Sequence, residues 1–390
     1  MKKILLVTRN FPPLRGGMER LNHHIYVELN KSFDVVVAGP ADIPLYLSPS
    51  TRYCEFPHRP LPVFFWFSFW STLRLAIKEK PALIISGSGI TALSARLIGC
   101  LCQAKVITFI HGLDVVMPHP VYQRLFLPAI RACDAIWVNS QNTANLAINK
   151  GVCSNKIKTV YPGVVIPENN TLSQCSTDFR SELGLTQDLK ILLSVGRLTE
   201  RKGLIEFILY SFPDIVKACP DCILIIIGDE PNNALHHKTG AKEKITQAAK
   251  HKGLEKHVFF LGHVSEFQLE AAYQSSQLHI FPVLDLPGDI EGFGMVAIEA
   301  AVYGLPTVAF AVGGVPEAVS HHKSGWLIEP GNYPAMTETV INSLANLNSS
   351  HQTVTPDSCR QHGAEFSWDI FGDRIKQLCW ELITQNEQNQ

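Results

Sequence analysis

The chain repeats one strand pattern near the start of each of its halves. Residues 3–7 read Lys-Ile-Leu-Leu-Val, and residues 190–195 read Lys-Ile-Leu-Leu-Ser-Val. After the first copy and a turn-rich loop, residues 18–29 have the spacing of an amphipathic helix, and residues 33–38 read as the next strand. Strands that alternate with helices in this way indicate a parallel, doubly wound α/β sheet. The repeat therefore predicts two Rossmann-like domains.

Composition places the chain among globular α/β proteins. Its 390 residues are 46% hydrophobic and 18% charged, enough for two buried cores. A formal net charge of −1 argues against a nucleic-acid partner, which would leave a basic footprint. Ten scattered cysteines indicate a reducing compartment. Residues 1–10 fit a first strand better than a signal peptide, and no apolar run reaches the roughly 20 residues of a spanning helix. We expect a cytoplasmic protein.

A polar stretch rich in Ser, Thr and Asn separates the two halves. We place this linker at residues 169–182, which leaves an N-terminal domain at 1–168 and a C-terminal domain at 183–365. Residues 366–390 are long and amphipathic enough for a final helix. Doubly wound domains bind ligands at the carboxyl ends of their strands, so we expect a ligand cleft between the two sheets.

Two glutamates bracket a glycine-rich loop in Asp289-Ile-Glu-Gly-Phe-Gly-Met-Val-Ala-Ile-Glu-Ala300. Gly292 and Gly294 allow close backbone approach, so the loop can present N–H groups to a ligand. Glu299 falls in a helix that we expect to be buried, where its carboxylate is costly unless it is hydrogen-bonded. The two hydroxyls of a ribose would satisfy it. The alternative makes Glu299 a partly exposed helix residue and Glu291 a neighbour of the helix N-cap.

A basic loop follows the second copy of the strand pattern, in Val195-Gly-Arg-Leu-Thr-Glu-Arg-Lys-Gly203. The guanidinium of Arg197 and the ammonium of Lys202 can converge on phosphate oxygens at this strand end. Removing one such donor typically costs on the order of 10²–10³ in rate. Because Arg201 is also present, a solvated basic loop without a ligand is the alternative.

Together with Gly313-Gly-Val-Pro-Glu317, these motifs resemble, in order and spacing, those of family 4 of the retaining glycosyltransferases. The resemblance covers nearly the whole chain. The loops are most similar to those of bacterial phosphatidylinositol mannosyltransferase-like and lipopolysaccharide glycosyltransferases. The family resemblance implies the GT-B fold, with acceptor binding by the first domain and nucleotide-sugar binding by the second. It also implies that the final helix crosses back to the first domain.

The resemblance assigns side-chain roles to five residues. Arg197 and Lys202 match the residues that bind the donor diphosphate. Glu299 matches the glutamate that holds the ribose hydroxyls, and Glu291 the one that contacts the donor sugar. His111, after the strand at 105–110, matches a histidine near the reacting sugar, where it would position a hydroxyl and stabilise an oxocarbenium-like state. The implied catalytic set is His111, Arg197, Lys202 and Glu291, and a structural histidine is the alternative for His111.

Loop and backbone groups complete the expected donor site. In the relatives, glycine-rich loops contact the diphosphate and the sugar, and a loop after a strand reads the base largely through its backbone. The matching positions are Gly16, Gly17, His263, Val264, Gly292, Phe293 and Gly294. For Gly16 and Gly17 the alternative is a tight turn.

The predicted function is transfer of a hexose from GDP-mannose or a UDP-hexose to a glycolipid or cell-envelope glycan, with retention as the family implies. No Asp-x-Asp motif occurs, and Arg197 and Lys202 can replace the charge of a metal, so we expect no cofactor and no divalent cation. Two alternatives stay open: a soluble-acceptor sugar synthase of the same fold, and a non-catalytic nucleotide-sugar-binding subunit. A Rossmann dehydrogenase is disfavoured because Gly-x-Gly-x-x-Gly follows neither first strand.

The most aromatic stretch of the chain is Val63-Phe-Phe-Trp-Phe-Ser-Phe-Trp70, which Arg74, Lys78 and Lys80 follow. One hypothesis is a helix buried on two sides. The other is that residues 63–80 lie at the inner face of the cytoplasmic membrane, with rings among the headgroups and basic side chains behind. A lipid-linked acceptor would suit the second hypothesis.

Overall fold

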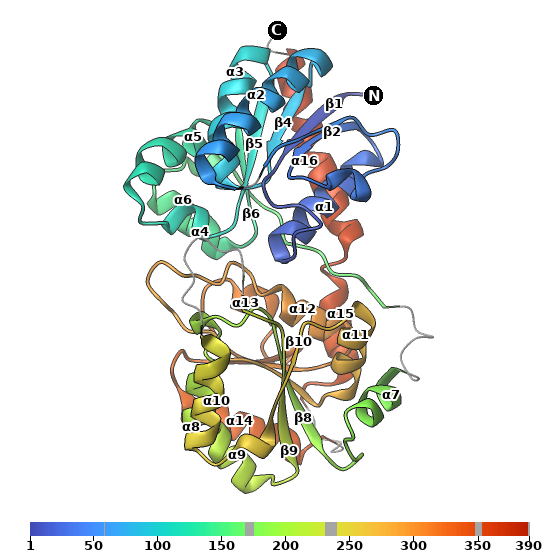
Figure 1. Ribbon diagram of the computed structural model, residues 1–390, viewed down its shortest axis with the longest axis vertical. Coiled ribbons are helices and arrows are strands. Elements are labelled where there is room, and N and C mark those ends of the chain that lie inside the picture. The colour runs from blue at the N-terminus through green and yellow to red at the C-terminus, as the bar shows by residue number, and fades with distance from the viewer. Residues whose placement is uncertain (58, 168–174, 231–239, 348–352, 389–390) are drawn as a thin grey trace. The chain divides into compact units, whose positions relative to one another are not determined.

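The computed structural model describes residues 1–57, 59–167, 175–230, 240–347 and 353–388 (Figure 1). The chain divides into two compact units. Unit 1 consists of Met1–Gly163 together with Trp368–Gln390, and unit 2 of Val164–Ser367. Each unit is built around its own parallel sheet, as the repeated strand pattern predicts.

Unit 1 holds a seven-stranded sheet in the order β3-β2-β1-β4-β5-β6-β7. The strands are β1 (Lys3–Val7), β2 (Asp34–Gly39), β3 (Tyr53–Glu55), β4 (Leu83–Ser86), β5 (Lys105–Ile110), β6 (Ala135–Val138) and β7 (Ile157–Thr159). The strand order reverses between β1 and β4. Such a switch point opens a crevice at the carboxyl ends of the two strands, where doubly wound folds bind ligands.

Helices cover both faces of this sheet. They are α1 (Gly17–Asn30), α2 (Leu61–Glu79), α3 (Gly89–Cys102), α4 (Leu113–Val116), α5 (Leu127–Ala132), α6 (Gln141–Asn149) and α16 (Trp368–Gln388), with short helical turns at Ile43–Tyr46, Tyr122–Phe126 and Ser154–Lys156. The buried side chains of α2, α3 and α5 share one core cluster with Leu5, Val7 and Val36, which point to one face of the sheet.

Unit 2 holds a six-stranded sheet in the order β10-β9-β8-β11-β12-β13, which reverses between β8 and β11. The strands are β8 (Lys190–Val195), β9 (Cys222–Ile227), β10 (Val258–Gly262), β11 (Leu278–Phe281), β12 (Thr307–Phe310) and β13 (Gly325–Ile328). Every residue of β9, β11 and β12 is buried, as expected for parallel strands that are covered on both faces.

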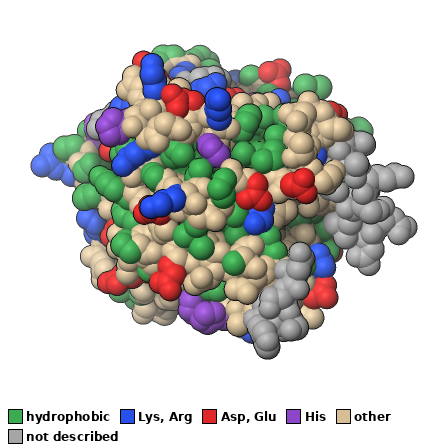
Figure 2. Space-filling model, turned by 90° about the horizontal axis from the view of Figure 1, so that it is seen from below, with side chains coloured by type: hydrophobic (Ala, Val, Ile, Leu, Met, Phe, Trp, Pro, Cys, Tyr) green, Lys and Arg blue, Asp and Glu red, His purple; other side chains and the backbone are tan. Residues whose placement is uncertain are grey.

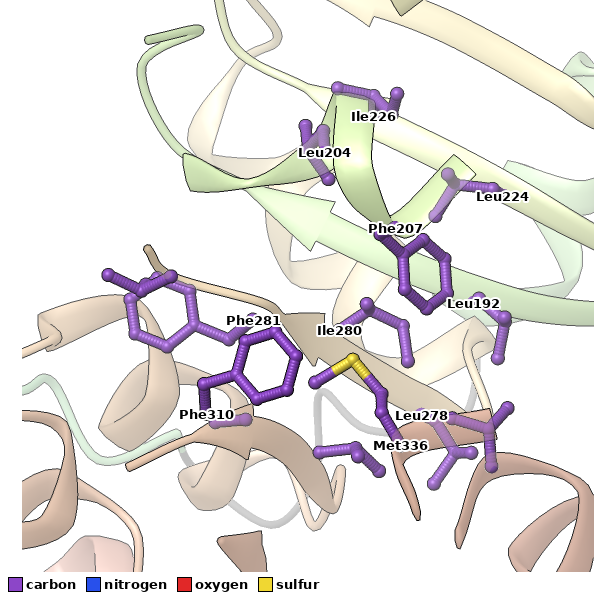
Figure 3. Close-up of a cluster of buried hydrophobic side chains, with 14 of the residues drawn as sticks. Leu192, Leu204, Phe207, Leu224, Ile226, Leu278, Ile280, Phe281, Phe310 and Met336 are labelled. Carbon is purple, nitrogen blue, oxygen red and sulfur yellow. The ribbon is translucent and has the colours of Figure 1, made fainter. Parts of the chain in front are cut away.

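The helices of unit 2 are α7 (Cys175–Glu182), α8 (Leu204–Tyr210), α9 (Phe212–Ala218), α10 (Ala241–His251), α11 (Glu266–Ser275), α12 (Met295–Val302), α13 (Val315–Ala318), α14 (Tyr333–Ala345) and α15 (Pro356–Ala364), with turns at Glu200–Lys202 and Glu255–His257. In the core, Phe207 of α8 and Met336 of α14 pack with strand side chains such as Leu192, Leu224 and Ile280 (Figure 3). This packing fixes the strand ends from which the site loops leave.

The domain boundaries differ from the sequence prediction near the linker. Residues 175–182, which we expected to be linker, form α7, and α7 packs against α11 within unit 2. Unit 1 ends at Gly163 and not at residue 168. The rest of the predicted linker, residues 169–174, lies outside the described residues. The polar composition of this stretch hid a helix whose Phe179 is buried in the second core.

The last helix, α16, belongs to unit 1. Its Trp368 ring stacks on His24 of α1 at 3.7 Å, and Trp380 lies 4.8 Å from the ring of Phe33. Its Gly372 also lies so close to α1 that an added Cβ would meet the Glu28 carboxylate. The chain thus enters unit 2 once and returns to complete unit 1.

The surface in Figure 2 mixes acidic, basic and apolar side chains without gathering one kind. Such a mixed surface is ordinary for a globular protein. Within the described residues, no helix is both long enough and apolar enough to cross a bilayer.

Candidate functional site

A cluster of charged side chains lies at the switch point of unit 2. The turn Glu200–Lys202 follows β8, and the loop that begins at Pro282 follows β11. The two loops touch: Leu284 N–H donates to the Arg201 carbonyl at 2.8 Å, and a Cβ at Gly203 would come within 1.9 Å of the Pro282 carbonyl oxygen. Gly203 also has a φ of 67°, so any side chain here would be both strained and in collision.

Two basic residues converge on one carboxylate in this cluster. Lys202 Nζ lies 2.8 Å from Glu291 Oε2, and Arg201 Nη1 donates to the same oxygen. Arg201 Nε donates in turn to Asp289 Oδ1 at 2.9 Å. The side chains of Arg201, Lys202 and Glu291 are at most 13% exposed, so these ion pairs are largely buried. They tie the loop after β8 to the loop after β11.

The electrostatics of the cluster keep Glu291 ionised. Burial alone would raise the pKa of Glu291, but Lys202 and Arg201 outweigh it and lower that pKa to about 2. Burial lowers the pKa of Lys202, and the attraction of Glu291 opposes this shift. Burial also acts against the charge of Arg201, yet Glu291 and Asp289 raise its pKa overall.

The ammonium of Lys202 packs on the ring of Phe281, which in turn stacks on His279. The ammonium lies 4.6 Å from the centre of the Phe281 ring, a cation–π distance. The His279 ring stacks on Phe281 at 5.6 Å, and burial together with the charge of Lys202 lowers the pKa of His279 to about 3. The ammonium therefore sits on a neutral surface that holds it at the strand ends.

The glycine-rich loop after Glu291 is braced by the next loop along the sheet. Gly314 N–H donates to the Glu291 carbonyl at 3.0 Å, and a Cβ at Gly314 would come within 2.1 Å of the Gly292 carbonyl oxygen. Phe293 is buried, and Gly294, with a φ of 99°, is the N-cap of α12. The predicted loop residues thus stand at the start of a buried helix.

Glu299 lies in α12 and is partly buried. Its Oε2 accepts a hydrogen bond from the Tyr273 hydroxyl at 3.2 Å. Tyr273 belongs to α11 and stacks on Tyr303 at 5.5 Å, so this hydroxyl is held in place. The carboxylate that we expected a ribose to satisfy therefore has a protein donor as well.

Three predicted positions stand outside the buried ion pairs of the charge cluster. Arg197 is exposed, although its charge contributes to lowering the Lys202 pKa. His263 is exposed and Val264 partly buried in the loop after β10, the edge strand. This edge is linked to the cluster through the backbone, because Gly228 N–H donates to the Gly262 carbonyl at 2.8 Å and Gly228 packs on Gly196.

The predicted residues of unit 1 lie at its own switch point. Gly16 is the N-cap of α1, and both Gly16 and Gly17 are exposed. A Cβ at Gly16 would meet the Glu19 carboxylate, which Asn10 Nδ2 holds at 2.7 Å. The start of a 14-residue helix attracts anions. A diphosphate at Gly16 and Gly17 would have to share this helix end with Glu19.

His111 is buried directly after β5. Its ring stacks on Phe109 at 4.8 Å, and its backbone N–H donates to Asp114 Oδ2 at 2.9 Å. Its Nε2 lies 3.2 Å from the carbonyl oxygen of Gly87, the residue after β4. Burial lowers the pKa of His111, and Asp114 only partly opposes this shift. The imidazole is therefore neutral at physiological pH.

The contact with Gly87 also fixes which ring nitrogen carries the proton. A carbonyl oxygen only accepts, so Nε2 carries the hydrogen and Nδ1 keeps its lone pair. His111 can thus accept a hydrogen bond from a hydroxyl group through Nδ1. The side chain is oriented by its neighbours and carries no charge.

Comparison with known families accounts for both halves of this architecture. Residues 15–166 match the family model described as Glycosyltransferase Family 4, and residues 176–355 match the one described as Glycosyl transferases group 1. The chain is a glycosyltransferase with a Family 4 domain and a group 1 domain. Its two sheets, with six and seven strands and a switch point each, have the GT-B fold that the sequence resemblance implies.

Relatives of this glycosyltransferase are distant. The chain is 27% identical over 285 residues to an uncharacterised glycosyltransferase of Methanocaldococcus jannaschii. The aligned segment covers 69% of this chain and 67% of the relative. The chain is also 27% identical over 257 residues to D-inositol 3-phosphate glycosyltransferase of Corynebacterium efficiens, covering 64% and 57%. The matched segments span about half to two thirds of the curated relatives.

A solved structure with the same fold is that of Anabaena HepE in complex with UDP-glucose. It superimposes with a TM-score of 0.76 and covers 98% of this chain and 100% of HepE, at 21% sequence identity. At that identity the likeness shows the fold alone.

Sequence reasoning missed two residues of the glycosyltransferase's charge cluster and the tyrosine that donates to Glu299. The presence of Arg201 favours a solvated loop in the sequence, yet this side chain is more buried than that of Arg197. Asp289 and Tyr273 carried no assigned role. A signal was available for Arg201, because it directly precedes Lys202 and two carboxylates follow in the facing loop. Within the described residues, no three His, Cys, Asp or Glu side chains are grouped as metal ligands.

Proposed function

We propose that this glycosyltransferase moves a hexose from a nucleotide-diphosphate sugar, GDP-mannose or a UDP-hexose, to a glycolipid or cell-envelope glycan. Retention of configuration and independence from divalent cations are parts of the proposal. It places the protein in the cytoplasm and at the inner face of the cytoplasmic membrane.

The observation that carries the proposal is the pairing of Lys202 with Glu291 at the switch point of unit 2. Glu291 has a pKa of about 2, so its carboxylate stays available as an acceptor for sugar hydroxyls. Lys202 offers the departing diphosphate an ammonium that packs on the neutral ring of Phe281. A buried cation stabilises developing negative charge more strongly than an exposed one, because little solvent screens it.

Other residues take the remaining proposed roles. Arg197 is exposed at the same loop and would add a guanidinium to the diphosphate oxygens, so the two cations would supply the charge that a metal supplies elsewhere. Glu299 would hold the ribose, with Tyr273 fixing one of its oxygens. The Nδ1 lone pair of His111 would accept a hydrogen bond from a sugar hydroxyl.

A second candidate is transfer to a small soluble acceptor. One relative is named for D-inositol 3-phosphate, a water-soluble molecule, and it matches 64% of this chain. The observation against this candidate is the aromatic helix α2, on which Trp66 is 64% exposed. A soluble acceptor gives no reason for such a surface.

A donor screen tests the proposal. Purified protein is incubated with UDP- and GDP-sugars, with and without EDTA, and both hydrolysis and thermal stabilisation are recorded. We expect one donor to stabilise the protein and to be hydrolysed slowly in EDTA, and we expect Glu299→Gln to abolish both effects. NMR of the product's anomeric proton then reports retention. Failure of every nucleotide sugar to bind would refute the proposal.

A further inference from the structure

The helix α2 turns a row of large apolar side chains to the solvent. The residues are spaced three, four or seven apart, so they fall on one side of the helix: Val63, Trp66, Phe67, Trp70 and Ile77. Trp66 is 64% and Ile77 60% exposed. Single exposed apolar residues are ordinary, but a contiguous row that includes two tryptophans marks a contact surface.

The buried side of α2 is less apolar than its exposed side. Phe64, Ser68, Thr72 and Ala76 face the core, so two of these four buried side chains carry hydroxyls. A helix that served only to cover the sheet would show the opposite arrangement. Large apolar side chains that stay in water forgo the free energy of burial, which indicates that the exposed side has a partner.

The neighbouring helices extend the apolar surface. α3 lies beside α2 and packs against it (Figure 1). Its Leu97 and Leu101, one helical turn apart, are exposed. The turn at Tyr122–Phe126 packs against α3 in its turn, and Val121 and Leu125 are exposed there. These elements and α2 form one helical layer of unit 1.

This layer lacks surface acids. Between residues 56 and 133 the acidic residues are Glu79 and Asp114 alone. Glu79 is buried and paired with Lys3 and Arg52, at 3.0 and 2.9 Å. Asp114 accepts the backbone N–H of His111. Glu79 is buried and Asp114 is partly buried, so neither carboxylate is exposed at the surface of this layer.

Basic side chains accompany the aromatic row. Arg74 lies one helical turn after Trp70 in the same row, and Lys78 follows one turn later. Both are exposed, as are Lys80 and Arg124. Amphipathic aromatic rings favour the headgroup region of a bilayer, and each nearby basic residue adds attraction to anionic lipids.

We propose that the layer formed by α2, α3 and residues 121–126 docks on an anionic lipid bilayer, with Trp66, Phe67 and Trp70 among the headgroups. This names the surface that would present the acceptor, and in that sense it rests on the proposed function. A second copy of this chain is the rival occupant. The acid-free layer favours lipid, since two copies placed face to face would oppose like charges.

Vesicle sedimentation tests the docking. The full chain is mixed with vesicles of phosphatidylcholine alone or with phosphatidylglycerol in equal parts, at low and at physiological salt. We expect sedimentation with the anionic vesicles, weakened by salt. The triple variant Trp66→Ser, Phe67→Ser, Trp70→Ser should reduce binding at least about tenfold. The pair Arg74→Gln, Lys78→Gln should reduce it by about fivefold per residue and flatten the salt dependence.

A matched control lies in unit 2, where Phe267 of α11 is also exposed. Phe267→Ser should leave vesicle binding unchanged. Donor hydrolysis in solution should be equal in all variants, so a failure of catalysis is distinguishable from a failure of docking. Wild-type sedimentation by the triple variant would overturn the proposal. The proposal would also be overturned if the wild type bound no vesicles and was a dimer in ultracentrifugation while the triple variant was a monomer. That result would assign the layer to a second copy.

Discussion

The two units share one topology but differ in how they equip their strand ends. Unit 2 places Arg201, Lys202 and Glu291 as buried charges at its switch point. Unit 1 offers exposed backbone at Gly16 and Gly17 and a neutral His111 at its own. The same doubly wound frame thus supports one site with buried cations and another whose histidine is neutral. The difference comes from the loops, since the sheets reverse in the same manner.

The difference assigns separate tasks to the two sites. A buried ammonium suits a ligand that carries or develops negative charge, whereas a neutral imidazole suits a hydroxyl. We therefore expect variants in unit 2 to change donor binding and leaving-group departure. Variants at His111 should change the reaction without changing donor affinity.

The sharpest test is Lys202→Gln. Loss of the buried ammonium should lower the transfer rate by about 10²–10³, because its charge is little screened. Arg197→Gln is the matched control, and its exposed side chain should cost only about tenfold. Steady-state rates with the best donor measure both. Equal losses would show that burial does not distinguish the two cations.

Arg201→Gln should act first on stability. It removes one partner of two ion pairs and leaves Glu291 with Lys202 alone, so we expect the free energy of unfolding to fall by about 3 kcal/mol. Asp289→Asn should cost less than about 1 kcal/mol, because the Asp289 side chain is 41% exposed. Urea denaturation measures both. Similar losses would mean that the pair with Asp289 matters as much as the pair with Glu291.

His111→Ala tests the site of unit 1. The loss of an oriented acceptor should lower kcat by about 10²-fold and leave the donor Kd unchanged. His111→Asn retains a smaller polar side chain and should recover part of the rate. Donor affinity is read by calorimetry. A weakened donor Kd would contradict the division of tasks between the units.

Acid should destabilise unit 2 through His279. This residue is fully buried, and its pKa is lowered to about 3, so only the unfolded chain takes up a proton as the pH falls below the usual histidine value. Stability present at neutral pH is therefore lost in acid, by about 2 kcal/mol between pH 6.5 and about 5. His279→Asn should remove this part of the pH dependence. Urea denaturation at the two pH values measures the free energy of unfolding of both proteins. If it falls by the same amount in His279→Asn as in the wild type, His279 is not the source of the pH dependence.

Sequence reasoning predicted the two doubly wound sheets, because hydrophobic periodicity and spacing record that feature. The return of the final helix was implied by the family resemblance. Sequence reasoning could not tell which neighbour in Arg201-Lys202 is buried against which carboxylate, because that depends on how two loops 88 residues apart along the chain meet. For α2 the periodicity alone left both hypotheses open. Only the fold shows that Ser68 and Thr72 face inward while Trp66 faces out.

The return of α16 to unit 1 has a consequence for how the protein forms during synthesis. Residues 164–367 are complete before Trp368 leaves the ribosome, so unit 2 can finish folding while unit 1 still lacks the helix that packs on α1. Domains generally fold as units in the order in which their chain emerges. Here the domain that starts first is finished last. A ribosome that stalls just before Trp368 would release a folded unit 2 attached to an incomplete unit 1, a species that quality-control proteases can recognise.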